Sequence, residues 1–496
     1  MEYRTQDTPP ALASALAFFD RLNAAGVHYG IFKSSRNTLV ALAGDQDLDI
    51  LVARSDYCKF CAIAGDSAGI RSVNHASLVS AGREDWFIPD FERGKYLHLD
   101  VHTAIRLGGK FNKRYPFLNY EDVRRWNHVV VGSCSIPIVS SEDEAAITLS
   151  RLAFRAPILA FDSWHRLRGT WAEELDELLS NGAGEIHTCC LVIGDPPLGC
   201  QVERRGEGIV VRRADLAAIR RMVTARRGAP VYATIADVLV NVFAATRYSA
   251  ARLLNRMSPG LTIDRRRPAR GGLLVAMIAP DGMGKTTQVT RMWRLFDWKF
   301  SCARLYLGTG DGEGWWLRRA IRSLYLRRRT AISASIDEFG GETARRGIRS
   351  RMIGVLLSFW GALTALERYM RVRAARRMAD RGVIVICDRW PQSLQAGLMD
   401  GPSRPAGNRP NLFRRWELSL YERMSRIPLD LTVHLMGDYE TAETRKPGEL
   451  TRDAFERRIA LMRKLQATTP QVQVVDADAD IDQVSKSVFR LIWQSL

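Results

Sequence analysis

The feature that most constrains the fold is a glycine-rich loop between an apolar run and a helical pattern. Residues Leu273 to Ile278 form a short continuous apolar run bounded by turn residues, as expected of a central parallel strand. The loop Ala279 to Thr287 follows, and a helical pattern continues to about Phe296. A strand, a glycine-rich loop and a helix in this order predict an α/β domain with a phosphate-binding loop (P-loop).

The residue types of this loop suit a nucleoside triphosphate. Lys285 is expected to reach the β- and γ-phosphates, and the Thr286 hydroxyl is expected to ligate Mg²⁺. The first glycine of the usual pattern is replaced by Ala279, which fits at little cost if its φ is negative and adds about 1 kcal/mol of strain if φ is positive. We therefore predict that ATP-Mg²⁺ binds at residues Asp281, Gly282, Met283, Gly284, Lys285, Thr286 and Thr287.

A second motif, Val383 to Trp390, follows the loop after about a hundred residues and ends in Asp388-Arg389-Trp390. Together the two motifs resemble thymidylate kinases and their relatives, and the likeness covers residues 273–496. The resemblance implies a P-loop kinase fold, with Asp388 beside Mg²⁺, Arg389 on the acceptor phosphate and Asp281 facing the acceptor. A carboxylate at a strand end beside a P-loop suits the role of Asp388, and a planar guanidinium suits that of Arg389.

Phosphoryl transfer needs more cations than Lys285, because charge spreads over the transition state. The segment Glu443 to Gly448 falls where such kinases carry a mobile lid, which makes Arg445 the candidate catalytic cation, with Lys446 and Arg452 as further lid candidates. A solvated basic helix is the alternative interpretation of the same residues.

The acceptor side departs from thymidylate kinases. They carry Arg-Glu-Pro-Gly after their second strand, where this chain has Tyr306 to Gly312. They also carry an arginine on the helix before the Asp-Arg strand, and Glu367 falls near that place here, with Arg368 beside it. Kinase-like proteins from bacterial surface-polysaccharide gene clusters are more similar. We expect a nucleoside monophosphate acceptor, with dTMP as the default. The alternatives are a sugar or glycan acceptor and an ATP-binding regulator or scaffold with little turnover.

The N-terminal region carries carboxylates in a strand pattern. Asp47 and Asp49 lie two positions apart and therefore on one face of a strand, and Asp100 belongs to another strand-like run. This pattern resembles nucleotidyltransferases, which implies that Asp47, Asp49 and Asp100 bind Mg²⁺. The usual Gly-Ser loop reads Lys33-Ser34 here, so the alternatives are an active nucleotidyltransferase and a degenerate domain whose acidic residues are solvated. His98 and His102 flank Asp100 and are expected to share its face.

A chain of 496 residues exceeds one hydrophobic core and predicts two or three domains. We expect a smaller α/β nucleotidyltransferase-like domain at 1–156, a mixed and partly helical connecting region at 157–263, an exposed basic linker at 264–272 and the kinase-like domain at 273–496. Helical patterns in the connecting region cover 163–179, 214–226 and 232–257. The last of these is amphipathic and is expected to pack between domains.

The formal charge of +18 favours anionic partners. Besides the nucleotide and the acceptor, the basic stretch from Trp315 to Arg329 suggests peripheral contact with an anionic membrane, an insertion over the acceptor pocket, or an ordinary basic helix face. Nucleic acid is not among the expected partners. The longest apolar run, Met352 to Leu366, is too short to span a bilayer, and no leader pattern precedes Ala11, so a cytoplasmic protein is expected. Thymidylate-kinase relatives commonly pair, which suggests a homodimer.

Overall fold

The computed structural model describes residues 9–74, 82–109, 112–123, 125–155, 164–167, 172–176, 188–191, 198–205, 208–225, 233–257, 265–308, 343–403, 411–468 and 471–496. The chain divides into two compact units, unit 1 at Met1–Ala269 and unit 2 at Arg270–Leu496. Both units combine helices with sheets, and the sheet of unit 2 is parallel, so the predicted α/β class is confirmed.

In the described part of unit 1, eight strands form a mixed sheet in the order β14-β3-β4-β5-β2-β1-β9-β8. The centre of this sheet is the parallel pair β2 and β5. Aromatic residues of α1 and α3 pack on it: Phe18, Phe19 and Phe60 are almost completely buried. The strands are β1 Tyr29–Ile31, β2 Asp47–Val52, β3 Ile70–Val73, β4 Arg83–Asp90, β5 Lys95–His102, β8 Trp126–Val131, β9 Cys134–Val139 and β14 Arg267–Pro268.

The remaining elements of unit 1 form a second layer. A two-stranded hairpin of β6 and β7 and a four-stranded antiparallel sheet, β10-β13-β12-β11, share a core with α4 and α6. The strands are β6 Ile105–Gly109, β7 Asn112–Leu118, β10 Trp164–Arg166, β11 Thr188–Leu191, β12 Leu198–Arg205 and β13 Gly208–Arg212. The helices of unit 1 are α1 Ala13–Ala24, α2 Thr38–Leu42, α3 Tyr57–Asp66, α4 Ser141–Arg155, α6 Arg213–Ala225 and α7 Ala233–Met257.

Two expectations for this part of the chain were wrong in detail. Of the helical pattern predicted at 163–179, Trp164–Arg166 is a strand because it pairs with β13, whereas residues 172–176 are helical. Arg267, expected in an exposed linker, is buried because Arg267 and Pro268 add an edge strand to β3. Helices do form at Arg213–Ala225 and Ala233–Met257, where the 3.6-residue periodicity indicated them.

In the described part of unit 2, five parallel strands lie in the order β16-β17-β15-β18-β19. The strands are β15 Leu273–Ile278, β16 Cys302–Tyr306, β17 Ile384–Asp388, β18 Leu431–Met436 and β19 Val472–Asp476. The central strand β15 is apolar throughout because helices cover both faces of the sheet. The strand order places β15 between β17 and β18, so the loop after β15 opens at the middle of the sheet's carboxyl edge.

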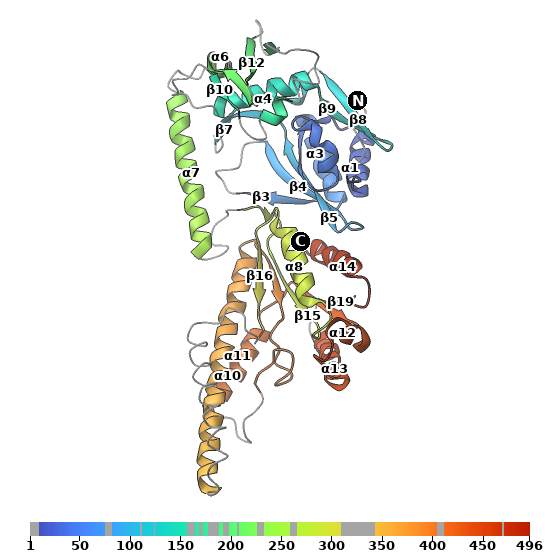
Figure 1. Ribbon diagram of the computed structural model, residues 1–496, viewed down its shortest axis with the longest axis vertical. Helices are drawn as coiled ribbons and strands as arrows, with labels where there is room; N and C mark the ends of the chain where they lie inside the picture. Colours follow the sequence, from blue (N-terminus) through green and yellow to red (C-terminus); the bar gives the residue numbers. More distant parts are fainter. Residues whose placement is uncertain are drawn as a thin grey trace. The chain divides into compact units, whose positions relative to one another are not determined.

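Helices α8 and α14 cover one face of this sheet, and α10 and α11 cover the other (Figure 1). On the first face Phe296 of α8 contacts Phe489 and Trp493 of α14. The helices of unit 2 are α8 Lys285–Asp297, α10 Thr343–Asp380, α11 Leu412–Ser425, α12 Tyr439–Arg445, α13 Arg452–Thr468 and α14 Ile481–Gln494. Among the residues described, no helix has both the length and the apolar content that crossing a membrane requires.

Candidate functional site

The loop between β15 and α8 has the backbone of a phosphate-binding loop. Gly282 and Gly284 adopt positive φ of 92° and 76°, where side chains are strained. A Cβ at Gly282 would lie 2.8 Å from the carbonyl oxygen of Ala442, so α12 also requires a glycine there. Ala279 is not among the described non-glycine residues with positive φ, so the missing first glycine adds no backbone strain.

Lys285 and Thr286, at the start of α8, lie where the sequence analysis expected them to act. Lys285 is 6% exposed, and its Nζ donates to the carbonyl oxygen of Ala279 at 3.3 Å. Burial, reinforced by Arg389, lowers the pKa of Lys285. The Thr286 hydroxyl donates to Asp388 Oδ2 at 2.9 Å, across 102 residues of sequence. The ends of β15 and β17 therefore bring the two predicted Mg²⁺ ligands together.

Asp388 is a suitable ligand for a cation. Its side chain is completely buried, and its Oδ1 accepts no hydrogen bond from any described residue. A buried carboxylate oxygen without a donor costs free energy, and a hydrated Mg²⁺ would satisfy it. Thr286 and Asp388 thus provide the hard oxygen atoms that this ion prefers.

A pocket opens beside the loop. It holds about 350 Å³ of empty space, part of which is open to solvent. Its lining residues are Ile278, Ala279, Asp281, Lys285, Arg389, Trp390, Met399, Asp400 and Arg458. Arg389, Met399 and Asp400 adopt positive φ of 73°, 41° and 59°. Such strain in non-glycine residues persists where surrounding structure holds it, and it concentrates at functional sites.

Asp281 joins three cations of this pocket. Its Oδ1 accepts from Arg389 at 2.8 Å and lies 3.8 Å from Lys285 Nζ, while its Oδ2 accepts from Arg458 at 2.7 Å. Burial would raise the pKa of Asp281, but Arg389, Lys285 and Arg458 outweigh it and keep the pKa below its usual value. The carboxylate therefore stays ionised and holds the cations close to each other.

Arg389 also contacts the opposite wall of the pocket. Its guanidinium lies 3.4 Å from Asp400 Oδ2 and over the ring of Tyr306, 6.0 Å from the centroid. Asp400 in turn accepts from Arg368 of α10 at 3.0 Å, and Arg368 is buried. Glu367, its neighbour, pairs with Arg371 instead. The predicted acceptor side thus contains an Arg368–Asp400–Arg389 chain of charges. Residues 309–312 of the expected acceptor loop and the stretch from Trp315 to Arg329 lie outside the described residues.

The candidate lid cations do not line the pocket. Arg445 donates to the carbonyl oxygen of Ala477 at 2.8 Å, Lys446 pairs with Glu449, and Arg452 pairs with Glu440. Arg458 of α13 lines it instead. It was not selected from sequence, although it follows the buried Phe455 by three positions and so lies on the apolar side of its helix. An arginine on an apolar helix face was the available signal.

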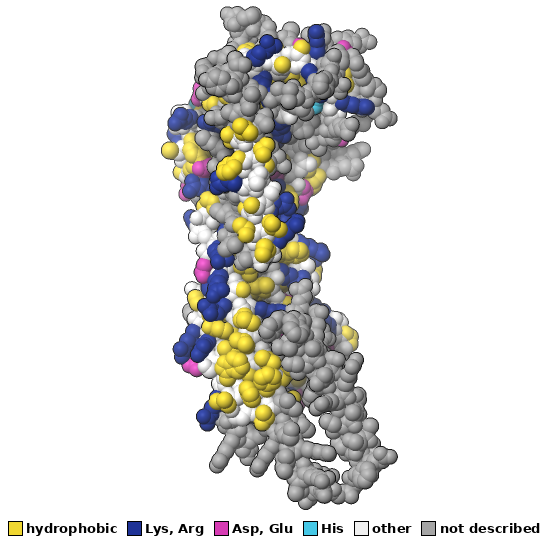
Figure 2. All heavy atoms as spheres, turned by 90° about the vertical axis from the view of Figure 1, so that its left-hand side faces the viewer, with side chains coloured by type: hydrophobic (Ala, Val, Ile, Leu, Met, Phe, Trp, Pro, Cys, Tyr) yellow, Lys and Arg dark blue, Asp and Glu magenta, His cyan; other side chains and the backbone are white. Residues whose placement is uncertain are grey.

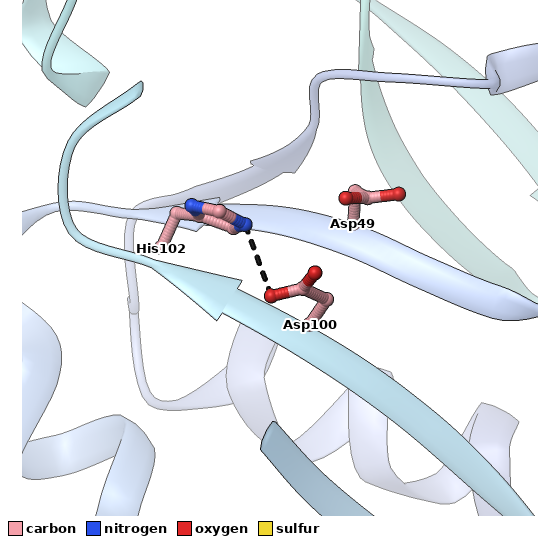
Figure 3. A group of neighbouring side chains, drawn as sticks. All are labelled: Asp49, Asp100 and His102. Carbon is pink, nitrogen blue, oxygen red and sulfur yellow. Dashed lines mark ion pairs between the residues drawn. The ribbon is translucent and has the colours of Figure 1, made fainter. Parts of the chain in front are cut away.

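The N-terminal carboxylates gather on adjacent strands β2 and β5. Asp49 and Asp100 pair across these strands, and Figure 3 shows them beside His102, whose Nε2 is 3.0 Å from Asp100 Oδ1. One ligand atom from each of these three residues lies within 4.8 Å of the others. Asp47 has a different neighbour, because its Oδ1 is 3.1 Å from Nδ1 of the buried His98. His98 also contacts Asp85, and the two carboxylates raise the pKa of His98 although burial opposes this shift.

Cations already occupy these carboxylates. Arg83 donates two hydrogen bonds to Asp100, at 2.7 and 2.6 Å, and Lys33 donates to Asp49 at 3.0 Å. Burial would raise the pKa of Asp100, but His102 and Arg83 hold it well below its usual value. Lys113 is nearby, and burial together with Arg83 lowers its pKa to about 8. A divalent ion at Asp49 and Asp100 would have to compete with Arg83 and Lys33.

The loop before this site contains a non-glycine residue with a left-handed backbone. Ser34 adopts φ 52°, the left-handed conformation that a glycine would take without strain. The next amide, that of Ser35, donates to Oε1 of the buried Glu144 at 3.1 Å. An internal carboxylate therefore accepts from an amide of this loop.

Comparisons with known proteins give a match over part of the chain. No family model matches this sequence. The chain is 28% identical over 222 residues to the protein named "Uncharacterized ATP-binding protein YghR" of Escherichia coli, in strain K12 and in O6:H1 strain CFT073. Each alignment covers 42% of this chain and 83% of the relative.

Solved structures with similarity to this chain include two thymidylate kinases, from Ehrlichia chaffeensis and Candida albicans. Both are 16% identical and cover 45% of this chain. The alignments include 98% of the E. chaffeensis chain and 91% of the C. albicans chain, with TM-scores of 0.25 and 0.26, respectively. The fold of unit 2 is established here by its own strand order and loop geometry.

Proposed function

We propose that unit 2 transfers the γ-phosphoryl group of ATP to an acceptor bound beside Arg389. The observation that carries this proposal is the meeting of Thr286, Asp388 and Lys285 at the carboxyl edge of the parallel sheet, with Arg389 in the same pocket. The name of the E. coli relative, an ATP-binding protein, agrees with the choice of nucleotide.

The loop amides and Lys285 bind the triphosphate in this proposal. Thr286 and Asp388 would hold Mg²⁺, which neutralises charge on the β- and γ-phosphates when it is bound. An acceptor oxygen attacks the γ-phosphorus, a new P–O bond forms, the bond to the β-phosphate bridging oxygen breaks, and ADP leaves. Lys285 and Arg458 provide the positive charge that the spreading transition-state charge needs.

Arg389 selects the acceptor. A guanidinium donates two parallel hydrogen bonds to a phosphate, so a monophosphate would replace Asp281 or Asp400 as a partner of Arg389. This favours a nucleoside monophosphate, with dTMP as the default. Arg445, Lys446 and Arg452 remain predictions for a lid that closes when substrates bind.

A hydroxyl acceptor is the second candidate, because the carboxylates of Asp281 and Asp400 also line the pocket. Carboxylates accept hydrogen bonds from sugar hydroxyls and take up their protons. A sugar or glycan kinase would use Asp281 in this way, and Arg389 would then only hold Asp281 in place.

The test is ATP consumption by the full chain with a panel of nucleoside monophosphates and sugars, with Lys285→Ala as the control. An accepted monophosphate should show an increased KM in Arg389→Lys, since a point charge replaces the guanidinium fork. A sugar acceptor should leave that KM unchanged and lose kcat in Asp281→Asn. Tight ATP binding with no acceptor-stimulated turnover above the control would instead indicate a nucleotide-gated regulator.

For unit 1, nucleotidyl transfer is a separate hypothesis. Mg²⁺ would bind between Asp49 and Asp100 only when Arg83 and Lys33 are displaced, so weak metal affinity is expected. Mg²⁺-dependent release of pyrophosphate from nucleoside triphosphates should disappear in Asp49→Ala and in Asp47→Ala. Absence of any pyrophosphate release from the unaltered chain would argue that this domain has lost transferase activity.

A further inference from the structure

Helix α7 of unit 1 has one side in contact with the protein and one side exposed. It contacts the β6–β7 hairpin, and Ala244 and Ala251 are its buried residues among those described. Small side chains at these two positions let the helix lie close to the hairpin. The other side of the helix has large apolar side chains that the described residues leave exposed.

The exposed apolar residues form one stripe. Leu239, Val242, Phe243, Leu253 and Met257 are each between 59% and 79% exposed. They recur at spacings that place them on the same helix face, and Leu254 extends the stripe. Figure 2 shows yellow apolar side chains along α7 with dark-blue side chains beside them. Monomeric proteins rarely expose this many large apolar side chains along one helix face without a partner.

Arginines border this stripe. Arg247 lies on one edge by helical spacing, and Arg252 and Arg256 lie on the other. Arg247 also contacts the ring of Phe243 at 5.8 Å. From Val238 to Ile263 the sequence contains no Asp or Glu, so no acidic group of this segment neutralises the three arginines.

From this arrangement we infer that α7 lies flat on an anionic lipid surface, with its apolar stripe among the acyl chains and its arginines at the phosphate groups. The helix has 25 residues and is therefore about 37 Å long. An apolar stripe with basic borders and an exposed Phe is the pattern of helices that bind at a membrane interface. This inference is independent of the proposed kinase function.

A second copy of the chain suits this face less well. Two copies that met through this stripe would bring both sets of arginines to one interface, and neither helix has an acidic residue after Asp237 to pair with them. Anionic phosphates supply the missing charge, and arginine forms paired hydrogen bonds with phosphate. Charge complementarity therefore selects an anionic lipid.

The experiment is flotation of the full chain with vesicles of phosphatidylcholine, with or without phosphatidylglycerol. The unaltered chain should float with the anionic vesicles and less at high salt. Arg252→Gln with Arg256→Gln should weaken binding by about thirty-fold, since each basic residue near an anionic surface contributes about a five-fold factor. Phe243→Ser with Leu253→Ser should weaken it by about a hundred-fold. Leu412→Ser, which alters an exposed leucine of α11, is the matched control and should leave binding unchanged.

A second measurement separates membrane insertion from loss of fold. When anionic vesicles are added, Phe243→Trp should show a blue-shifted emission that brominated lipids quench, beyond any change in the unaltered chain. The inference is overturned if the unaltered chain does not float at low salt, or if vesicles leave the emission of the introduced tryptophan unaffected. A change of oligomeric state in the Phe243, Leu253 double variant, without any vesicle binding by the unaltered chain, would assign the stripe to a second copy.

Discussion

Replacement of Asp281 by Asn should destabilise unit 2 without ligand and make its stability more dependent on an added anion. The variant keeps the size of the side chain and removes the charge that faces Arg389, Arg458 and Lys285. Those three cations then repel one another in a pocket where Lys285 is 6% exposed. The loss of stability should therefore exceed the loss that follows when an ordinary surface ion pair is removed.

The size of the effect follows from the distances. At an effective dielectric constant of about 20, each of the pairs near 2.8 Å attracts by about 6 kcal/mol before desolvation is counted. Desolvation cancels much of this, and breaking a buried pair typically costs about 3–5 kcal/mol. Because Arg389 and Arg458 are partly exposed, we expect the free energy of unfolding of unit 2 to fall by about 3 kcal/mol. For a unit of this size that corresponds to about 6–12 °C in Tm.

The assay is thermal unfolding of the full chain at pH 7. The transition of unit 2 is identified as the one that ATP or inorganic tripolyphosphate shifts. In Asp281→Asn this transition should occur at lower temperature, and tripolyphosphate should raise it by more than in the unaltered chain, because the anion supplies the missing negative charge. Glu422→Gln removes an exposed ion pair with Arg426 and should change Tm by little.

The pH dependence gives a further check on Asp281. Its pKa in the folded chain lies below the usual carboxyl value, so its contribution is present above about pH 4 and is lost as the pH falls through the folded pKa. The difference between the variant and the unaltered chain should shrink in acid. An Asp281→Asn protein with unchanged Tm at pH 7 would refute the claim that this carboxylate holds the three cations.

Three other substitutions test separate parts of the chain. Arg458→Met should lower kcat of an identified kinase reaction by about 10–100-fold with little change in KM for ATP. The control Arg463→Met alters an exposed arginine of the same helix and should leave kcat unchanged. Equal kinetics in both variants would limit Arg458 to a structural role. His434 is buried without a hydrogen-bond partner among the described residues, and burial lowers its pKa to about 4. The unfolded histidine gains a proton below about pH 6.5 and the folded one does not, so the free energy of unfolding should fall by about 2 kcal/mol from pH 7 to pH 5. Urea titrations of His434→Leu should lack this pH-dependent component. Ser34→Gly should raise the free energy of unfolding of unit 1 by about 1 kcal/mol, since glycine adopts the left-handed conformation without strain; a decrease in urea unfolding would show that the Ser34 side chain matters more.

Much of unit 2 was predictable from local sequence. The apolar run at Leu273–Ile278, the glycines of the loop and the helical pattern after it are properties of a short segment, and each depends on backbone geometry that neighbouring residues determine. That Thr286 and Asp388 lie near each other was also predicted, because parallel strands end at one edge of a sheet, whereas their direct hydrogen bond was not. The 3.6-residue periodicity of apolar residues also predicted α6 and α7.

Strand pairing and the partners of charged side chains could not be read in this way. Trp164–Arg166 carries a helical pattern, yet it is a strand because β13 offers hydrogen-bond partners at matching register. Arg267 belongs to a run of charges, but an edge of the sheet in unit 1 buries it. Long-range pairing overrode local preference at both places.

The sequence alone determined the type of the loop, the order of the motifs and the faces on which Asp49 and Asp100 lie, since these follow from chain geometry over a few residues. Tertiary structure decided which charges meet. Arg458 reaches Asp281 across 177 residues, Arg83 and Lys33 occupy the N-terminal carboxylates, and the apolar stripe of α7 is exposed. A side chain's periodicity gives its direction on its own element, but its partner depends on how distant elements pack, and no local pattern contains that information.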